Sequence, residues 1–162
     1  MGYLGRAIAA CALVAAMAAA APTPTPDPVV VEIGINAGYD AQCAALMRGD
    51  ADGWAKTLAA GFVPTMAGGK TGDAKTARDG VASLLASAKI EKCRIVAESI
   101  DMDGADAVVG AAINMSGTRT DGKTIEIEQH AVDRWTPAGD AWLQKSSKVS
   151  EQTVWVDGAV VH

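Results

Sequence analysis

The sequence predicts an α+β domain in which three N-terminal helices cover the concave face of a curved antiparallel sheet of about four long strands. Apolar residues recur at helical spacing up to about residue 89, and extended segments rich in Val, Ile, Thr and Trp follow. Turn sequences such as Asp-Gly separate those segments. Helices followed by a hairpin-linked meander are typical of an α+β fold. A chain of 162 residues suits one such domain.

The first 21 residues predict a signal peptide rather than a part of this domain. One Arg precedes the apolar run "AIAACALVAAMAAAA", whose Ala-rich end offers small-residue cleavage sites. The run is shorter than the roughly 20 residues that span a bilayer. The alternative is a lipoprotein signal that carries lipid at Cys11. The sequence therefore predicts an exported chain, periplasmic or secreted, without stable membrane insertion.

A Pro-rich linker and N-terminal arm are expected over residues 22–34, because "PTPTPDP" favours an extended, solvated backbone. The folded domain is then expected over residues 35–158, with a short tail at 159–162. The net charge is −5. This balance argues against nucleic acid or anionic lipid as a partner, because both require clustered Lys and Arg.

Three helices are expected at the start of the domain. The first covers residues 35–48, where apolar side chains recur on one side. Asp50 can cap a second helix over about 51–60, and the following "FVPT" extends the chain because proline cannot continue a helix. Asp73 can cap a third helix over 73–89.

Long strands make up the rest of the domain. They are expected in residues 89–102, 105–117, 123–135 and 141–156, with a possible short strand at "FVPT". Strands of about a dozen residues allow a twisted sheet to curl. A curled sheet under helices leaves a hollow. The small side chains of "AVVGAAIN" either allow close helix packing or widen that hollow.

Cys43 and Cys93 are the cysteines left after signal-peptide cleavage, and we expect them to form a disulfide in an exported chain. Two buried free thiols are the alternative. No group of His and Cys has metal-ligand spacing, so no metal and no cofactor are predicted. "GGKT" at 68–71 lacks the remaining glycine of a phosphate-binding loop.

The order of elements and several segments resemble the nuclear transport factor 2-like superfamily, in particular its small bacterial SnoaL-like branch. The matching segments are "ALMRGDADGWAKTLAAGFV", "GDAKTARDGVASLL" and "AVDRWTPAGDAWLQKSSKVSEQTVWVDG". The resemblance implies a cone-shaped α+β barrel with a pocket, which commonly dimerises through its sheet. Members include isomerases, dehydratases, cyclases and epoxide hydrolases, and also non-catalytic binding modules.

The chain departs from the family pattern at one position. Many members use an acidic residue near the end of the second helix or on the strand after it. Here that region is "LAAGFVPTMAGG", which contains no carboxylate. A mechanism like that of the steroid isomerases is therefore disfavoured.

Candidate site residues come from the helices and from one strand. His130 is the histidine inside the domain, and Glu128 shares its face of the strand, so the pair could act in general acid–base catalysis. The alternative is a His130 on the solvent or dimer face. Tyr39, Trp54 and Phe62 are expected to line the ligand pocket with His130, or to be ordinary core residues.

Three functions follow from these observations. The favoured one is an exported, non-catalytic module with a pocket for a small apolar or amphipathic ligand. The second is a cofactor-free lyase or isomerase that uses His130. The third is an accessory module that forms a homodimer through the sheet face, with Trp135, Trp142 and Trp155 on the outside.

Overall fold

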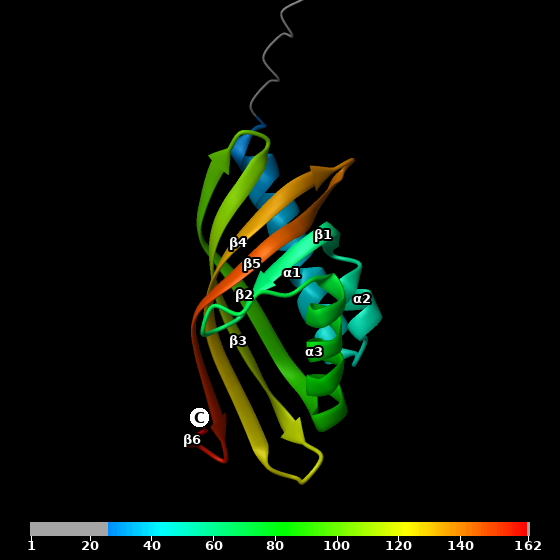
Figure 1. Cartoon of the computed structure of the whole chain (residues 1–162), viewed down its shortest axis with the longest axis vertical. Coiled ribbons are helices and arrows are strands. Elements are labelled where there is room, and N and C mark those ends of the chain that lie inside the picture. The colour runs from blue at the N-terminus through cyan, green and yellow to red at the C-terminus, as the bar shows by residue number, and fades with distance from the viewer. Residues whose placement is uncertain (1–25, 162) are drawn as a thin grey trace, which may run out of the picture.

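The computed structural model describes residues 26–161, which form three helices and six strands (Figure 1). The predicted signal peptide, its alternative lipid site at Cys11 and most of the Pro-rich segment lie outside the described residues. The helices are α1 (Pro28–Met47), α2 (Ala51–Ala55) and α3 (Ala74–Ser87). The strands are β1 (Leu58–Thr65), β2 (Ala88–Asp103), β3 (Asp106–Arg119), β4 (Thr124–Ala138), β5 (Ala141–Val156) and β6 (Ala159–Val161). Within residues 26–161, no helix is long and apolar enough to cross a membrane.

The sheet has the strand order β1-β5-β4-β3-β2, and β6 pairs with the end of β5. From β2 to β5 the strands form the predicted antiparallel meander. These four strands are long and bent, and the three helices lie together on one side of the sheet (Figure 1). The predicted α+β class and the curved sheet are confirmed.

The sheet is mixed rather than purely antiparallel. β1 lies beside β5 and runs parallel to it, with Val63 opposite Ser146 and Thr65 opposite Lys148. "FVPT" is therefore a strand, as expected, but its partner lies far along the chain. A parallel partner leaves no turn signal in the sequence, because a hairpin cannot join parallel strands.

The first helix begins at Pro28 instead of residue 35, so the predicted N-terminal arm is helical over its last part. The Asp27 side chain accepts a hydrogen bond from Val29 N at 2.9 Å, and Pro28 occupies the first turn, where proline is tolerated. Val31 and Ile35 are fully buried. Their burial outweighs the weak helix propensity of the β-branched residues in this stretch.

Two further boundaries differ from the predicted ones. The second helix ends at Ala55 rather than near residue 60, because the chain enters β1 at Leu58. The predicted tail forms β6 after a turn in which Asp157 and Gly158 both have positive φ, at 49° and 77°. Positive φ at both central residues is the backbone of a tight hairpin turn.

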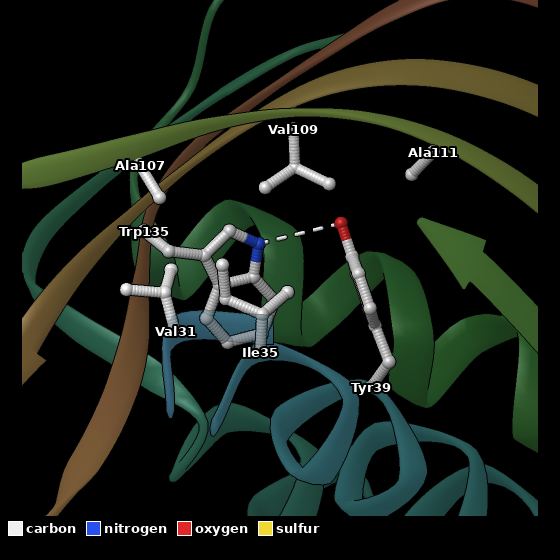
Figure 2. Close-up of a cluster of buried hydrophobic side chains, with 7 residues drawn as sticks. All are labelled: Val31, Ile35, Tyr39, Ala107, Val109, Ala111 and Trp135. Atoms are coloured by element: carbon white, nitrogen blue, oxygen red, sulfur yellow. Dashed lines mark hydrogen bonds between the residues drawn. The ribbon is translucent and has the colours of Figure 1, made fainter. Parts of the chain in front are cut away.

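The main hydrophobic core joins α1 to β3 and β4. Figure 2 shows its buried members Val31, Ile35, Tyr39, Ala107, Val109, Ala111 and Trp135. The Tyr39 and Trp135 rings pack edge to face, with centroids 4.9 Å apart. A second, smaller cluster at the other end of the sheet contains Ala88, Ile125 and Ile127.

Two glycines of α1 allow the helix to lie directly on tryptophan rings. A Cβ at Gly34 would overlap the ring of Trp142, and a Cβ at Gly38 would overlap that of Trp135. Trp135 is fully buried, and Trp142 packs against the same core. The alternative that placed these two tryptophans on a dimer face is therefore wrong, because both pack on the helix side of the sheet.

The disulfide predicted between Cys43 and Cys93 is present, with an S–S distance of 2.00 Å and a Cα–Cα distance of 5.3 Å. It joins the last turns of α1 to β2.

In the antiparallel part of the sheet, β2 and β5 carry β-bulges, which are single extra residues in the pairing. In β2 the extra residues are Glu91 and Glu98, between which the pairing with β3 is regular. In β5 they are Lys145 and Ser150, opposite an uninterrupted β4. A bulge bends its strand and increases its twist, so the bulges contribute to the curvature of the sheet.

Candidate functional site

A cavity of about 430 Å³ lies between the inner face of the sheet, one side of α3, and β1 with the loop that follows it. Its apolar lining includes Leu46, Trp54, Phe62, Pro64, Met66, Val81, Leu84, Ile95, Ile113, Met115, Ile127 and Val149. Its polar lining consists of Gln42, Gln129, Asp133, Gln144, Ser147 and Gln152. A concave, mostly apolar site of this size with a few polar groups is typical of small-molecule binding sites.

The cavity opens to solvent on the side of α3. Ala67, Gly80 and Gln152 line it and are themselves exposed, so they mark the entrance. On α3 the cavity is lined by Ala77, Gly80, Val81 and Leu84; Gly80 and Val81 each lie three or four residues from both Ala77 and Leu84. That spacing places them on one side of the helix.

The strands direct their polar groups into the cavity in two different ways. β4 alternates regularly, so Ile127, Gln129 and Asp133 all face inward. β5 does not alternate, since its inward residues Gln144 and Ser147 are separated by the bulge at Lys145. The bulge therefore turns Ser147 toward the cavity, opposite Asp133 in the register.

Asp133 is the acidic residue of this site, and its exposed fraction is 1%. Its Oδ2 accepts a hydrogen bond from the Tyr39 hydroxyl at 2.8 Å, and that hydroxyl accepts one from Trp135 Nε1 at 3.3 Å, the bond drawn in Figure 2. Asp133 Oδ1 is the one buried side-chain N or O atom in residues 26–161 that has no hydrogen-bond partner. A buried oxygen without a partner is costly, so it marks a position where a ligand could be held.

Burial is the main cause of the pKa shifts of Asp133 and Tyr39. Removal from water raises the pKa of the Asp133 carboxyl above its ordinary value, and the neighbouring Ser147, Tyr39 and Gln144 offset a part of that shift. Burial, followed by the charge of Asp133, raises the pKa of the Tyr39 hydroxyl far above its ordinary range. Tyr39 therefore remains a hydrogen-bond donor, whereas the Asp133 carboxyl, with its raised pKa, keeps its proton to a higher pH than an exposed aspartate does.

A network of amides closes the end of the cavity near α1. Gln42 Nε2 donates to Gln144 Oε1 at 2.8 Å and to Thr57 Oγ1 at 3.1 Å. The backbone N–H of Gln144 donates to the Thr57 carbonyl at 2.9 Å. These bonds fix the position of Gln144, which lies beside Asp133 on the cavity wall.

The structure brings together two of the four residues predicted to form the pocket. Trp54 and Phe62 line the cavity, whereas Tyr39 lies behind it, in the core, with its hydroxyl on Asp133. His130 lies on the opposite face of β4, where its side chain is 51% exposed and its Nδ1 is 3.6 Å from Glu98. This placement corrects the interpretation of His130 as a pocket base: alternation along β4 directs Gln129 and Asp133 inward and His130 outward.

Asp133 was missed as a site residue, although a signal for it exists. Residues 125, 127, 131 and 135 on the same face are Ile, Ile, Ala and Trp, and all four are buried. An acidic residue in such an apolar row is rarely buried without a partner or a function.

Within residues 26–161, no group of three or more His, Cys, Asp or Glu side chains could hold a metal ion.

Comparison with known proteins places this geometry in a recognised fold. The sequence matches no protein-family model and no curated protein. The structure is similar to that of a conserved protein from Planctomyces limnophilus, with a TM-score of 0.66 and 14% identity over 74% of this chain and 94% of the other. It is also similar to a hexachlorocyclohexane dehydrochlorinase, with a TM-score of 0.59 and 11% identity over 78% and 90%. A protein whose name includes NTF2 matches with a TM-score of 0.53 and 14% identity over 76% and 100%. These likenesses show that the chain shares its fold with these proteins.

Proposed function

We propose that this protein is a non-catalytic binding protein whose cavity holds a small apolar molecule bearing one polar group. The observation that carries the proposal is the combination of an apolar cavity and one buried carboxylate oxygen without a partner, Asp133 Oδ1. The apolar lining provides affinity, and the carboxyl group orients the ligand. The name of one protein with this fold refers to hexachlorocyclohexane, which is a small apolar molecule. That likeness supports a ligand of this class.

Proton transfer by Asp133 is the second candidate function. It is favoured by one observation, a buried carboxyl on a cavity-lining residue whose pKa is raised and whose Oδ1 has no hydrogen-bond partner. In this reading Asp133 takes the role that the sequence suggested for His130, in a lyase or isomerase that moves one proton. A ligand that is released chemically unchanged favours binding, and a converted one favours catalysis.

Export is proposed from the signal sequence and from the Cys43–Cys93 disulfide, because disulfides persist in oxidising compartments. A homodimer through the outer sheet face is proposed from the resemblance and from Val132, which is 47% exposed at the middle of that face. Trp155 is half-buried on β5 and would lie at the margin of such an interface.

Mass spectrometry of the protein purified from its own cells tests these proposals together. Under native conditions we expect a dimer whose subunits each retain one small molecule, and after denaturation a chain that lacks about the first 21 residues. Gly80→Leu should remove the retained molecule, because Gly80 lines the cavity and has open space around its Cβ position.

Ala86→Leu is the matched control, because it adds the same side chain at an exposed position of α3 outside the cavity lining. The control should retain the molecule. A protein that carries no small molecule, or a Gly80→Leu variant that retains it as the control does, would contradict the binding function.

A further inference from the structure

We propose that the cavity selects apolar amines, whose ammonium group forms an ion pair with the free Oδ1 of Asp133. This inference rests on the proposed binding function and adds to it the chemical class of the ligand.

The lining of the cavity carries an unbalanced charge. Among the described residues that line it, Asp133 is the one with a formal charge, and neither Lys, Arg nor His is present. An ionised Asp133 is thus a buried negative charge without a cation beside it. Such a charge is strongly unfavourable unless a proton or an opposite charge neutralises it. A cationic ligand supplies the missing charge.

The groups around the carboxyl show that no protein cation takes this place. From α1 the titratable group is the Tyr39 hydroxyl, which donates to Oδ2. β5 presents the uncharged Ser147 and Gln144, and β3 presents Val109 opposite Asp133. Oδ1 is therefore left as a buried acceptor, with Ser147 and Gln144 beside the carboxyl, on a residue that lines the cavity.

An ammonium group satisfies this position better than the alternatives. It donates hydrogen bonds and carries the complementary charge, and hydrogen bonds between ionised groups are about twice as strong as neutral ones. A hydroxyl group can also donate to the ionised oxygen, but it leaves the negative charge uncompensated. A carboxylate ligand repels Asp133. Ser147 lies opposite Asp133 and offers a second acceptor for the same ammonium group.

Amine binding must depend on pH in a defined direction. Burial raises the pKa of Asp133, so this carboxyl keeps a proton to a higher pH than an exposed aspartate does, and an ammonium ligand has to displace that proton. Amine affinity therefore rises as the pH rises through the pKa of Asp133, and it falls only where the amine loses its own proton. The affinity of a neutral ligand does not rise over the same range.

Three probes that share a phenyl ring and a short alkyl chain test the inference. Phenethylamine is a cation, phenethyl alcohol is neutral and hydrocinnamate is an anion. Binding is measured by calorimetry and by the fluorescence of Trp54, which lines the cavity. At about pH 8 we expect phenethylamine to bind at least about tenfold more tightly than the alcohol, with hydrocinnamate weakest. Amine affinity should fall as the pH is lowered toward 4.

Two variants make the result specific. Asp133→Asn keeps the shape and an acceptor for Tyr39 but removes the charge, so it should weaken phenethylamine at least about tenfold, remove its pH dependence, and leave phenethyl alcohol unchanged. Asp140→Asn removes a charge from the exposed β4–β5 turn and should change neither probe.

The outcomes separate this inference from the proposed function. If the alcohol or the anion binds as tightly as the amine, or if Asp133→Asn leaves amine affinity intact, the choice of amines is wrong while the binding function stands. If no probe binds and the protein purified from its own cells carries no small molecule, the binding function fails as well.

Discussion

At the scale of residues, the site depends on the carboxyl of Asp133, which hydrogen bonds hold in place and whose charge no neighbouring cation neutralises. Tyr39 donates to Asp133 Oδ2, and Trp135 in turn donates to the Tyr39 hydroxyl. This chain of donors fixes the carboxyl against the core, and its other oxygen has no hydrogen-bond partner although Asp133 lines the cavity. The position of Asp133 is thus determined by packing around α1, whereas its raised pKa is determined by its burial.

Asp133→Asn should stabilise the protein more at neutral pH than at acid pH. The folded pKa of Asp133 is raised above the unfolded value of 3.8, so the folded protein holds a proton that the unfolded chain loses. Wild-type stability therefore loses this contribution as the pH rises from the unfolded pKa through the folded pKa. Urea unfolding at several pH values between about 4 and 8 should show a wild-type-to-variant difference that grows with pH. A difference that is constant, or that shrinks with pH, would show that burial does not raise this pKa.

The sequence predicted only a part of the site at this scale. Trp54 and Phe62 were identified because aromatic residues near the ends of covering helices face the sheet. His130 was chosen for its chemistry, although the regular alternation that buries Ile127 and Trp135 places His130 outside. A choice based on alternation would have identified Asp133. Its free oxygen, in contrast, depends on where Tyr39 and Ser147 lie, and no local pattern reveals that.

At the scale of elements, α1 lies close to the sheet because Gly34 and Gly38 leave room for two indole rings. The same two glycines lower its helix propensity. The helix therefore depends on tertiary contacts, in which the rings of Trp135 and Trp142 replace the missing side chains.

Gly38→Ala should lower the free energy of unfolding by about 1 to 3 kcal/mol, because the new methyl group overlaps the fully buried Trp135 ring. Gly80→Ala is the matched control in α3, where nothing lies within 4 Å of the added Cβ. The control should be neutral or stabilising by up to about 1 kcal/mol. Denaturant unfolding measures both variants. Equal effects of the two substitutions would exclude a packing role for Gly38.

Strand prediction succeeded where alternation is regular and was incomplete where it is interrupted. β3 and β4 pair without a shift, and their turns carry Gly104 and Gly122 at positive φ, so turn signals and periodicity agree. In β5 the bulges at Lys145 and Ser150 shift the inward positions, so the polar wall of the cavity could not be assigned from alternation. The pairing of β1 left no signal because its partner strand is parallel and distant.

At the scale of the whole molecule, the Cys43–Cys93 disulfide spans a sequence separation of 50 residues that includes α2, β1 and α3. These elements form one wall of the cavity. A bond that closes a long loop lowers the entropy of the unfolded chain, and the loss is large for loops of this size.

Replacing both cysteines, as Cys43→Ala with Cys93→Ala, should lower the free energy of unfolding by roughly 4 kcal/mol. Urea unfolding of the oxidised wild type and the double variant measures the loss. Alkylation followed by intact-mass measurement provides the control, because the oxidised wild type should gain mass only after reduction. Alkylation of the untreated protein at both cysteines would show that the bond does not form.

The global architecture was more predictable than the site, since helix caps at Asp50 and Asp73 and hairpin turns are local features. The cavity is a global feature, because it depends on how far the sheet bends and on which residues the bulges turn inward.

The two edges of the sheet restrict how copies of the protein can associate. On β1, Pro64 lacks the N–H that an added strand would require. On β2, the bulges at Glu91 and Glu98 interrupt the outer hydrogen-bonding row and place exposed carboxylates there. Natural proteins use both devices against strand addition and fibril growth. β1 and β2 are thereby protected from strand addition, whereas the short edge strand β6 carries the exposed Val160 and Val161. The broad outer face is left as the surface through which the proposed homodimer would form.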